Sequence, residues 1–455
     1  MFDPKAEAMS RDERAALQRH RLWGLVDRLM LAGGVQADRL REAGVKRGAD
    51  VTLAELHKLP FTTKQDLWDS YPLGMLAVPQ DQVVAVHGST GTKGRPTLVA
   101  YTKADLDLWA SMCARSLSCA GASAESVVHN AYGYGLFTGG LGIHQGAVAL
   151  GATVVPMSGG MTERQVRMLA DLKPDVLTCT PAYALRLAEA AAEAGVDLSS
   201  LKTGVFGAEP WSEELRAAIQ DALPIKALDI YGLSEVIGPG VATECLEQNG
   251  LHVNEDHFIV EAIDPETGTP VADGEPGELV FTTPTKQALP LLRYRTGDVA
   301  SLTHGDCNCG RTLVRMSKVR GRVDDMLVIR GVNVYPSEVE RVLLGTGQVV
   351  PHYQLIVDRR KPDVRLVVAC EAATEAATEA ATEAATEAAE AASGASPEAA
   401  EGTLAEELTR ALRADLGLTA DVRVLPSGTV PRVEVGKAVR VVTWESGEPP
   451  LPGIG

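Results

Sequence analysis

The middle of the chain alternates short apolar runs with helix-like segments, and this alternation restricts the fold more than any other feature. The alternation is seen in the segments SVVHNAYGYG, HQGAVALGATVVP, PDVLTCTPAYALRLAEAAAEAG, LKTGVFGAEPW and IKALDIYGLSE, all between residues 126 and 235. Strands that alternate with helices usually pair in parallel, with the helices covering the sheet. The sequence therefore predicts an α/β fold with a largely parallel sheet.

Three loops that follow strand-like runs are rich, as a group, in glycine, aromatic and acidic residues. They are YGYGLFTGG at 132–140, GAEPW at 207–211 and YGLSE at 231–235. Open parallel sheets bind their ligands beyond the carboxyl ends of the strands. We therefore expect the functional site to lie where these loops meet.

The 455 residues suit two or three domains, and the pattern changes along the chain. After residue 244 the segments become shorter and more β-like, which predicts a β-rich subdomain. A smaller α+β unit follows. We expect a large N-terminal domain at 1–323 and a small C-terminal domain at 324–455. The Glu/Ala repeat at 371–401 is expected to be a surface insertion in that second domain.

Charge and composition exclude several classes of partner. The formal net charge is −17, and no basic cluster with interleaved aromatic residues is present. Nucleic acids and anionic membranes are therefore poor candidates. The first twenty residues lack the pattern of a secretory signal, and no apolar run is long enough to span a membrane. Seven scattered cysteines do not suggest a disulfide framework, so we expect a cytoplasmic protein with reduced thiols.

The stretch HGSTGTKGRPTLVAYT, at 87–102, has the composition of a phosphate-binding loop. It is not a Walker A motif, because a β-like run rather than a helix follows it. Its hydroxyl groups, glycine amides and two basic side chains nevertheless suit a polyphosphate that is held and then released. A solvated turn between two strands is the alternative interpretation.

Further motifs follow this loop in a fixed order. They are YGLSE, RYRTGD at 293–298, GRVDDMLVIRGVNVYP at 321–336 and PRVEVGKAVRV at 431–441. This set resembles the adenylate-forming superfamily. The details NAYGYGLFTGGLG, SGGMTERQ, DIYGLSEVIGPGVATEC, EDHF and CNCGRT narrow the resemblance to the phenylacetate–CoA ligase and aryl-CoA ligase family. The resemblance implies the adenylate-forming fold, with a small mobile C-terminal domain.

It also implies a reaction in two steps. A carboxylate attacks the α-phosphorus of ATP to give an acyl-adenylate, and the sulfur of CoA then displaces AMP. The first step gathers negative charge on phosphoryl oxygens, so it requires positioning and positive charge. The family pattern assigns Glu235 to Mg²⁺, Asp298 to the ribose hydroxyls and Arg322 to the nucleotide. The residues that it assigns to the phosphates are Ser89, Thr90, Gly91, Thr92, Lys93 and Gly94. Those that it assigns to adenine are Ala208, Glu209, Pro210, Asp229, Ile230 and Tyr231.

The C-terminal domain supplies the remaining catalytic positions. Lys437 lies where the family has its catalytic lysine, although a lone lysine would otherwise be taken as a surface residue. Asp324 lies at the hinge position, about which the domain is expected to turn between the two steps. The turn also brings the loop at Gly331 toward the CoA pantetheine.

The acyl pocket is expected to suit a flat ring, because its candidate wall combines aromatic and small apolar residues. Gln145, Val148 and Gln287 depart from the family pattern, so phenylacetate, a substituted benzoate, an aminobenzoate and a small hydroxy acid all stay open as substrates. The candidate wall comprises Tyr134, Phe137, Ile237, Gly238 and Pro239, with Ala208 and Glu209.

Three cysteines and one histidine form a candidate structural zinc site. Cys245, His252, Cys307 and Cys309 provide a valid tetrahedral set, although the spacing is not that of a zinc ribbon. His257 or His304 is an alternative fourth ligand. Buried thiols without a metal are the competing interpretation.

Two other activities remain open at this point. An adenylating enzyme that passes its acyl group to a carrier-protein thiol or an amine would share every ATP-binding residue. An inactive binding protein is disfavoured by the complete set of Glu235, Asp298, Arg322 and Lys437. The resemblance also suggests a homodimer.

Overall fold

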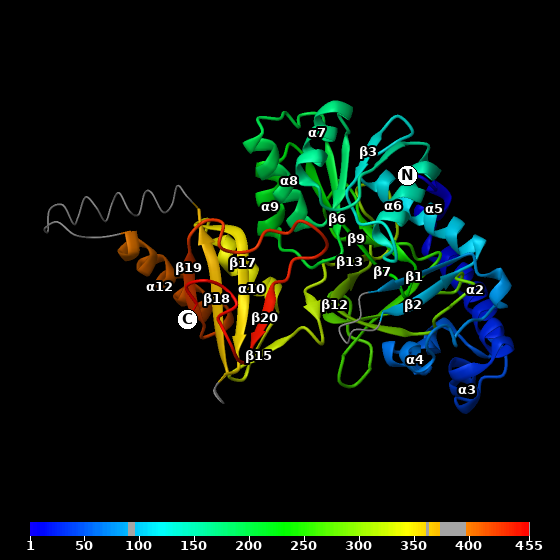
Figure 1. Ribbon diagram of the computed structural model, residues 1–455. Coiled ribbons are helices and arrows are strands. Elements are labelled where there is room, and N and C mark those ends of the chain that lie inside the picture. Colours follow the sequence, from blue (N-terminus) through cyan, green and yellow to red (C-terminus); the bar gives the residue numbers. More distant parts are fainter. Residues whose placement is uncertain (90–95, 361–363, 374–396, 455) are drawn as a thin grey trace, which may run out of the picture. The chain divides into compact units, whose positions relative to one another are not determined.

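The computed structural model describes residues 1–89, 96–360, 364–373 and 397–454, the side chains of 397–403 excepted (Figure 1). The chain forms two compact units. The first contains Met1–Thr180, Leu187–Ala208 and Leu223–Val319, and the second contains Pro181–Arg186, Glu209–Ala222 and Arg320–Gly455. The long segment of the second unit begins at Arg320, close to the expected boundary at 323/324. The expected division into an N-terminal domain and a mobile C-terminal domain stays a prediction.

The first unit is built on one large sheet that is parallel in one half. Neighbouring strands follow the order β4-β3-β5-β6-β7, and each pair is parallel. These strands are the predicted apolar runs: β3 (Val127–Asn130), β4 (Thr153–Pro156), β5 (Val176–Cys179), β6 (Thr203–Gly207) and β7 (Lys226–Leu233). The loops that follow β3, β6 and β7 therefore leave the same edge of the sheet, as expected.

The other half of this sheet is antiparallel, in the order β7-β8-β9-β13-β12-β11-β10. This is the β-rich part expected after residue 244. Its strands are β8 (Gly238–Glu244), β9 (Leu251–Val253), β10 (Ile259–Ile263), β11 (Pro276–Thr282), β12 (Tyr294–Thr303) and β13 (Arg315–Met316). A separate hairpin of β1 (Ala85–Ser89) and β2 (Thr97–Tyr101) flanks the phosphate-loop candidate, so the strand–loop–strand expectation is confirmed.

Helices α5 (Lys103–Cys119) and α6 (Gly139–Leu150) lie side by side (Figure 1). Helix α5 begins with a capping box, in which Thr102 and Asp105 satisfy each other's backbone amides. Its apolar residues and those of α6 join strand residues such as Val205 and Leu228 in a core that contains no exposed side chain. The remaining helices linked to this region are α7 (Thr162–Leu172) and α8 (Pro181–Glu193).

The N-terminal residues form helices of varied length around the antiparallel half (Figure 1). Helix α2 has a capping box at Ser10, and α4 has one at Thr63. Leu22, Leu25 and Leu40 pack into one apolar cluster. The elements are α1 (Pro4–Glu7), α2 (Arg11–Ala32), α3 (Gly34–Glu42), α4 (Lys64–Asp69), and the 3₁₀ turns η1 (Gly48–Asp50), η2 (Leu53–Lys58) and η3 (Gln80–Gln82).

The second unit has its own sheet, in the order β19-β18-β17-β20. Strands β17 and β18 are antiparallel, whereas β19 and β20 join their edges in parallel. The elements are α9 (Glu213–Ala222), β14 (Gly321–Arg322), β15 (Leu327–Ile329), β16 (Val332–Val334), α10 (Pro336–Gly345), β17 (Val349–Asp358), β18 (Arg365–Ala372), α12 (Pro397–Leu416), β19 (Asp421–Leu425) and β20 (Val441–Trp444). Most of the Glu/Ala repeat lies outside the described residues.

Among the described residues, no helix has both the length and the apolar content that a membrane crossing requires.

Candidate functional site

Glu235 lies in the turn between β7 and β8, and the backbone around it is unusual. The pairing of these strands shifts register between Tyr231 and Gly232. A β-carbon on Gly232 would lie 1.9 Å from the carbonyl oxygen of Gly238, so only glycine allows this approach. The turn that follows buries Glu235, whose exposed fraction is 3%.

The Glu235 carboxylate contacts the strand that leads into the phosphate-loop candidate. Ser89 Oγ, at the end of β1, donates a hydrogen bond to Glu235 Oε1 at 3.0 Å. Lys64 Nζ, from the first turn of α4, lies 3.6 Å from the same oxygen. The other residues expected in this loop, Thr90, Gly91, Thr92, Lys93 and Gly94, lie outside the described residues.

The loop after β3 is tied to the same strand. The amide of Gly88 donates to the Leu136 carbonyl oxygen at 2.8 Å, and His87 Nδ1 lies 3.1 Å from that oxygen. Burial lowers the pKa of His87. Three segments far apart in the sequence therefore meet at β1: the start of the phosphate loop, the acidic turn and the glycine/aromatic loop.

Of the expected acyl-pocket residues, Tyr134 is held most firmly. Its hydroxyl accepts a hydrogen bond from Asn130 Nδ2 at 2.8 Å and lies 3.2 Å from His144 Nδ1. Burial raises the pKa of Tyr134. Phe137, in contrast, has a 48% exposed side chain.

The three expected wall residues after Glu235 are mostly held by their backbone. Tyr101 Oη donates to the carbonyl oxygen of Ile237 at 3.0 Å, and Trp109 Nε1 donates to that of Pro239 at 3.0 Å. Ile237 is fully buried in the main hydrophobic core. Gly238 has a φ of 114°, which favours glycine.

Tyr231 and Asp298 meet across the sheet. The Tyr231 hydroxyl, on β7, donates a hydrogen bond to Asp298 Oδ2 at 2.7 Å. The tyrosine ring stacks on Phe281 with a centroid separation of 6.0 Å. Two residues that the sequence assigned separately, to adenine and to ribose, are thus neighbours.

The other adenine candidates of the first unit differ in what they present. Ala208 follows β6 with a φ of 73°, a left-handed conformation that is uncommon for alanine and marks a sharp change of direction. Asp229 is buried on β7, with its amide donating to Glu244 Oε2. The Ile230 side chain belongs to a buried apolar cluster, and its backbone pairs with Gly207 of β6 and Thr243 of β8.

The remaining nucleotide and hinge candidates belong to the second unit. Glu209 precedes the exposed Pro210 and accepts hydrogen bonds from the amides of Ala182 and Ala438, at 3.1 and 2.7 Å. Burial raises the pKa of Glu209.

Arg322 Nε donates to Asp324 Oδ1 at 2.9 Å, in the segment expected to be the hinge. Lys437 is exposed. Burial and Asp324 raise the pKa of Asp325, while Arg322 and Lys437 oppose this shift. Gly331, with a φ of 83°, is in the turn of the β15–β16 hairpin.

The four candidate zinc ligands come together in the first unit. Their donor atoms all lie within 4.8 Å of one another. Cys245 Sγ is 3.8 Å from Cys307 Sγ, and Cys309 Sγ is 3.5 Å from His252 Nε2. Pairing of β9 with β13 brings His252 near the segment that carries Cys307 and Cys309. Cys307 is 62 residues from Cys245 in the sequence.

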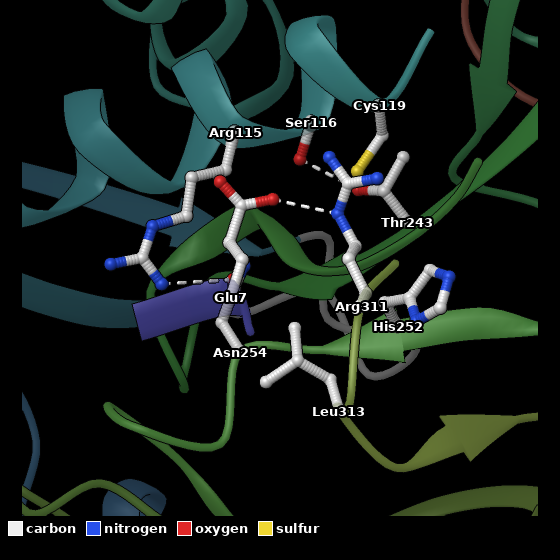
Figure 2. Close-up of a pocket in the computed structure, with 9 residues that line it drawn as sticks. All are labelled: Glu7, Arg115, Ser116, Cys119, Thr243, His252, Asn254, Arg311 and Leu313. Carbon is white, nitrogen blue, oxygen red and sulfur yellow. Dashed lines mark hydrogen bonds and ion pairs between the residues drawn. The ribbon is translucent and has the colours of Figure 1, made fainter. Parts of the chain in front are cut away.

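A small buried pocket lies beside this cluster (Figure 2). Arg311 Nε donates to Glu7 Oε2 at 2.6 Å, and its Nη1 lies 3.5 Å from Cys309 Sγ. A guanidinium in this place would favour thiolates over thiols. The lining residues are Glu7, Arg115, Ser116, Cys119, Thr243, His252, Asn254, Arg311 and Leu313.

Sequence reasoning missed three residues that contact the acidic turn. They are Lys64, Tyr101 and Lys286, to which the sequence patterns assign no role. The Nζ atom of Lys286 is fully buried and donates to the Glu235 carbonyl oxygen at 2.9 Å. Nothing in the local pattern TKQALP distinguishes this lysine from a surface residue.

Comparison with known proteins gives two family matches and several full-length relatives. Residues 30–287 match the family described as AMP-binding enzyme, and residues 331–443 match the AMP-binding enzyme C-terminal domain. The chain is 48% identical to a phenylacetate-coenzyme A ligase of Thermus thermophilus, over 97% of this chain and 99% of the relative. It is 46% identical to a phenylacetate-coenzyme A ligase of Escherichia coli, over 97% of each chain.

A solved structure is also similar. A 2-hydroxyisobutyryl-CoA ligase in its postadenylation state, bound to an acyl-adenylate, has a TM-score of 0.87 and 26% identity, over 97% of this chain and 91% of that one. The same ligase in its thioesterification state has a TM-score of 0.69. The motifs in order, the α/β fold and the near-complete matches all agree. The chain therefore belongs to the AMP-binding enzyme family of adenylate-forming ligases, in the group of the phenylacetate–CoA ligases.

Proposed function

We propose that this enzyme activates an aryl acid with ATP and transfers the acyl group to CoA, with phenylacetate as the first candidate acid. The observation that carries the proposal is the 3.0 Å contact between Ser89 and Glu235, because it joins the start of the phosphate loop to the acidic turn. The aryl acid is favoured over other acids by the phenylacetate–CoA ligases, which match the chain at 44–48% identity.

In the first step, a carboxylate oxygen of the acid attacks the α-phosphorus of ATP and pyrophosphate leaves. Glu235 would hold Mg²⁺, which supplies charge neutralisation to the phosphate oxygens when bound. The carboxylate suits this task, since it is buried, lies in a turn and accepts a hydrogen bond from Ser89, which precedes the loop expected to hold the phosphates. Ser89 and the loop that follows would orient the β- and γ-phosphates.

Lys437 and Asp298 would act at opposite ends of the nucleotide. The ammonium of Lys437 is a compact charge that can approach the bridging oxygen as negative charge develops there. Asp298, oriented by the Tyr231 hydroxyl, would accept hydrogen bonds from the ribose hydroxyls. Arg322 would contact the nucleotide phosphate.

In the second step the CoA sulfur attacks the acyl carbon, and AMP leaves. We propose that the C-terminal domain turns about Asp324 between the steps, withdrawing Lys437 and bringing the Gly331 turn to the pantetheine. The similar 2-hydroxyisobutyryl-CoA ligase has been solved in states named postadenylation and thioesterification, which supports a rearrangement of this kind. A carrier-protein thiol or an amine is the alternative acceptor.

The cysteine/histidine cluster fits a structural zinc ion. With Zn–S near 2.3 Å and Zn–N near 2.0–2.1 Å, a tetrahedral site places sulfurs about 3.8 Å apart, and sulfur and nitrogen about 3.6 Å apart. The corresponding distances are 3.8 Å and 3.5 Å. Cys245, His252, Cys307 and Cys309 would fill all four positions, so the ion would have no open site for chemistry. A homodimer and a cytoplasmic location stay predictions.

The test is acid-dependent ATP–pyrophosphate exchange over a panel of aryl and short hydroxy acids, with CoA thioester formation measured in parallel. We expect phenylacetate or a close aryl acid to drive both. Lys437→Ala should lower exchange by about 10²–10³-fold, because it removes one positioned charge from the transition state. Exchange without a thioester would transfer the proposal to a carrier protein or an amine. Absence of exchange with every acid would contradict it.

A further inference from the structure

Lys286 is a buried cation at the back of the acidic turn. Its exposed fraction is 0%, although lysine is rarely buried completely. The Nζ atom donates to the main-chain oxygen of Glu235 at 2.9 Å and lies 5.2 Å from the centre of the Tyr101 ring. Burying an ammonium costs several kcal/mol, so other interactions must offset this cost.

The compensation comes from α5. Asp105 Oδ1 accepts a hydrogen bond from the amide of Gln287 at 2.6 Å, and its Oδ2 accepts one from the amide of Ala288 at 2.9 Å. The same carboxylate attracts the Lys286 ammonium electrostatically. Asp105 thus fixes both the backbone that carries Lys286 and the charge at the end of its side chain.

Several side chains donate hydrogen bonds to backbone carbonyl oxygens of the turn. Besides the Lys286 contact, Tyr101 Oη lies 3.3 Å from the Ser234 carbonyl oxygen and 3.0 Å from that of Ile237. Ser234 Oγ lies 3.1 Å from Thr138 Oγ1. Lys286 therefore holds the one residue of the turn whose carboxylate faces Ser89.

We infer that Lys286 is a positioning residue for Glu235, an inference that rests on the proposed role of Glu235 in holding Mg²⁺. The carboxylate of Glu235 must exchange its contacts with Ser89 and Lys64 for the ion when Mg·ATP binds. The carbonyl oxygen takes no part in that exchange. Its bond to Lys286 keeps the main chain in place while the side chain changes partners, so the site does not have to be ordered anew for each turnover.

A purely electrostatic role makes the opposite prediction. A cation near a metal site repels the metal, so removing its charge would strengthen Mg²⁺ binding. Removing a support weakens Mg²⁺ binding instead. A role limited to stability would change the folded fraction and leave the Mg²⁺ requirement of the folded enzyme as it is. The three possibilities are therefore separated by the direction of one measured quantity.

The experiment compares the full-length wild type with Lys286→Met, Lys286→Gln and Arg14→Met. Arg14 is a matched control, since it is 4% exposed and also donates to carbonyl oxygens, those of Met9 and Thr312, away from Glu235. The free Mg²⁺ concentration for half-maximal ATP–pyrophosphate exchange is measured at saturating ATP and acid. Thermal unfolding gives the folded fraction of each variant.

We expect Lys286→Met to raise the half-maximal Mg²⁺ concentration about ten-fold or more, the size typical of lost outer-shell partners. Lys286→Gln keeps a donor without a charge and should recover part of the shift. Arg14→Met should keep the wild-type value even if it unfolds at a lower temperature. An unchanged or lowered Mg²⁺ requirement in folded Lys286→Met would overturn the inference. Failure of the wild type to show exchange would instead count against the proposed function.

Discussion

At the scale of single residues, the Tyr231 hydroxyl donates a hydrogen bond to Asp298, the residue proposed to hold the ribose. A neutral hydroxyl bonded to a carboxylate at 2.7 Å fixes the plane of that carboxylate before any ligand arrives. In the proposed role, Asp298 would accept hydrogen bonds from the ribose hydroxyls. Orientation of an acceptor in advance reduces the entropy lost when the nucleotide binds.

This arrangement predicts the effect of Tyr231→Phe. Loss of a hydrogen bond to a charged group is worth about 1.5–3 kcal/mol, of which a part should appear in nucleotide binding. We expect the KM for ATP to rise about ten-fold, with kcat changed much less, in steady-state assays of thioester formation. Tyr132→Phe is the control, because it removes a buried hydroxyl that lies 3.5 Å from the Val205 carbonyl oxygen. Equal KM values for the two variants would contradict the assignment.

At the scale of elements, the four candidate zinc ligands lie on or beside strands that are far apart in the sequence. Cys245 follows β8, His252 is on β9 and the two later cysteines precede β13. An ion bound to all four would tie both ends of this antiparallel region together. Since binding to the folded state alone adds to stability, the metal and the fold are coupled.

We expect the purified wild type to hold about one zinc per chain and Cys309→Ser to hold much less, as measured by elemental analysis. The variant should unfold at a temperature about 5–10 °C lower, because a structural zinc contributes several kcal/mol. Cys179→Ser changes a buried cysteine of β5 outside the cluster and should keep the metal. Full zinc content in Cys309→Ser would show that the cluster does not bind the ion as proposed.

A second element-scale feature lies in the second unit, where Glu371 of β18 holds the segment that leads to Lys437. Its carboxylate accepts hydrogen bonds from the amides of Gly428 and Val430, at 3.1 and 2.7 Å, and pairs with Arg432 at 2.9 Å. Burial alone would raise the pKa of Glu371, but Arg432 and the two amides outweigh it and lower the pKa below its usual value. The carboxylate is therefore stabilising only while it is ionised.

The sign of the pH dependence follows from this lowered pKa. Glu371 contributes stability that is fully present above its unfolded-state pKa, about 4.3, and is lost as pH falls through the folded-state pKa. We expect Glu371→Gln to lower the free energy of unfolding by about 2–3 kcal/mol at pH 7, and by less as the pH falls below about 4. Urea unfolding across this pH range is the measurement.

Asp421→Asn is the control for this prediction. Its exposed ion pair with Arg423 should contribute less than about 0.5 kcal/mol at any pH. A difference between wild type and Glu371→Gln that stays constant down to pH 3 would mean that the Glu371 charge has no part in holding the segment.

At the scale of the whole molecule, the alternation of strand-like and helix-like segments predicted the fold correctly. The parallel strands and the strand–loop–strand at Ser89 both follow from local patterns. The ATP-site and zinc residues were assigned by resemblance, since no local rule joins Ser89 to Glu235, 146 residues later. Neither local pattern nor family resemblance pointed to Lys286. Its burial depends on how α5 packs against the acidic turn, and no spacing within TKQALP predicts that packing.

The largest consequence of the two-unit organisation is the proposed turn about Asp324. Proline at this position would fix φ near −65° and remove one of the torsions on which such a turn depends. We expect Asp324→Pro to keep ATP–pyrophosphate exchange within about ten-fold of wild type. Thioester formation from preformed acyl-adenylate and CoA should fall at least ten-fold further, in single-turnover measurements, because only that step needs the second arrangement.

Asp324→Ala distinguishes the backbone from the carboxylate. Alanine removes the 2.9 Å contact with Arg322 but leaves φ free, so both half-reactions should continue. Loss of thioester formation in Asp324→Ala as well would assign the effect to the Arg322 contact. Equal loss of both half-reactions in Asp324→Pro would place the hinge elsewhere. Selective loss in the proline variant alone requires that adenylation and thioester formation use different arrangements of the same chain, because a single rigid arrangement would respond equally in both steps.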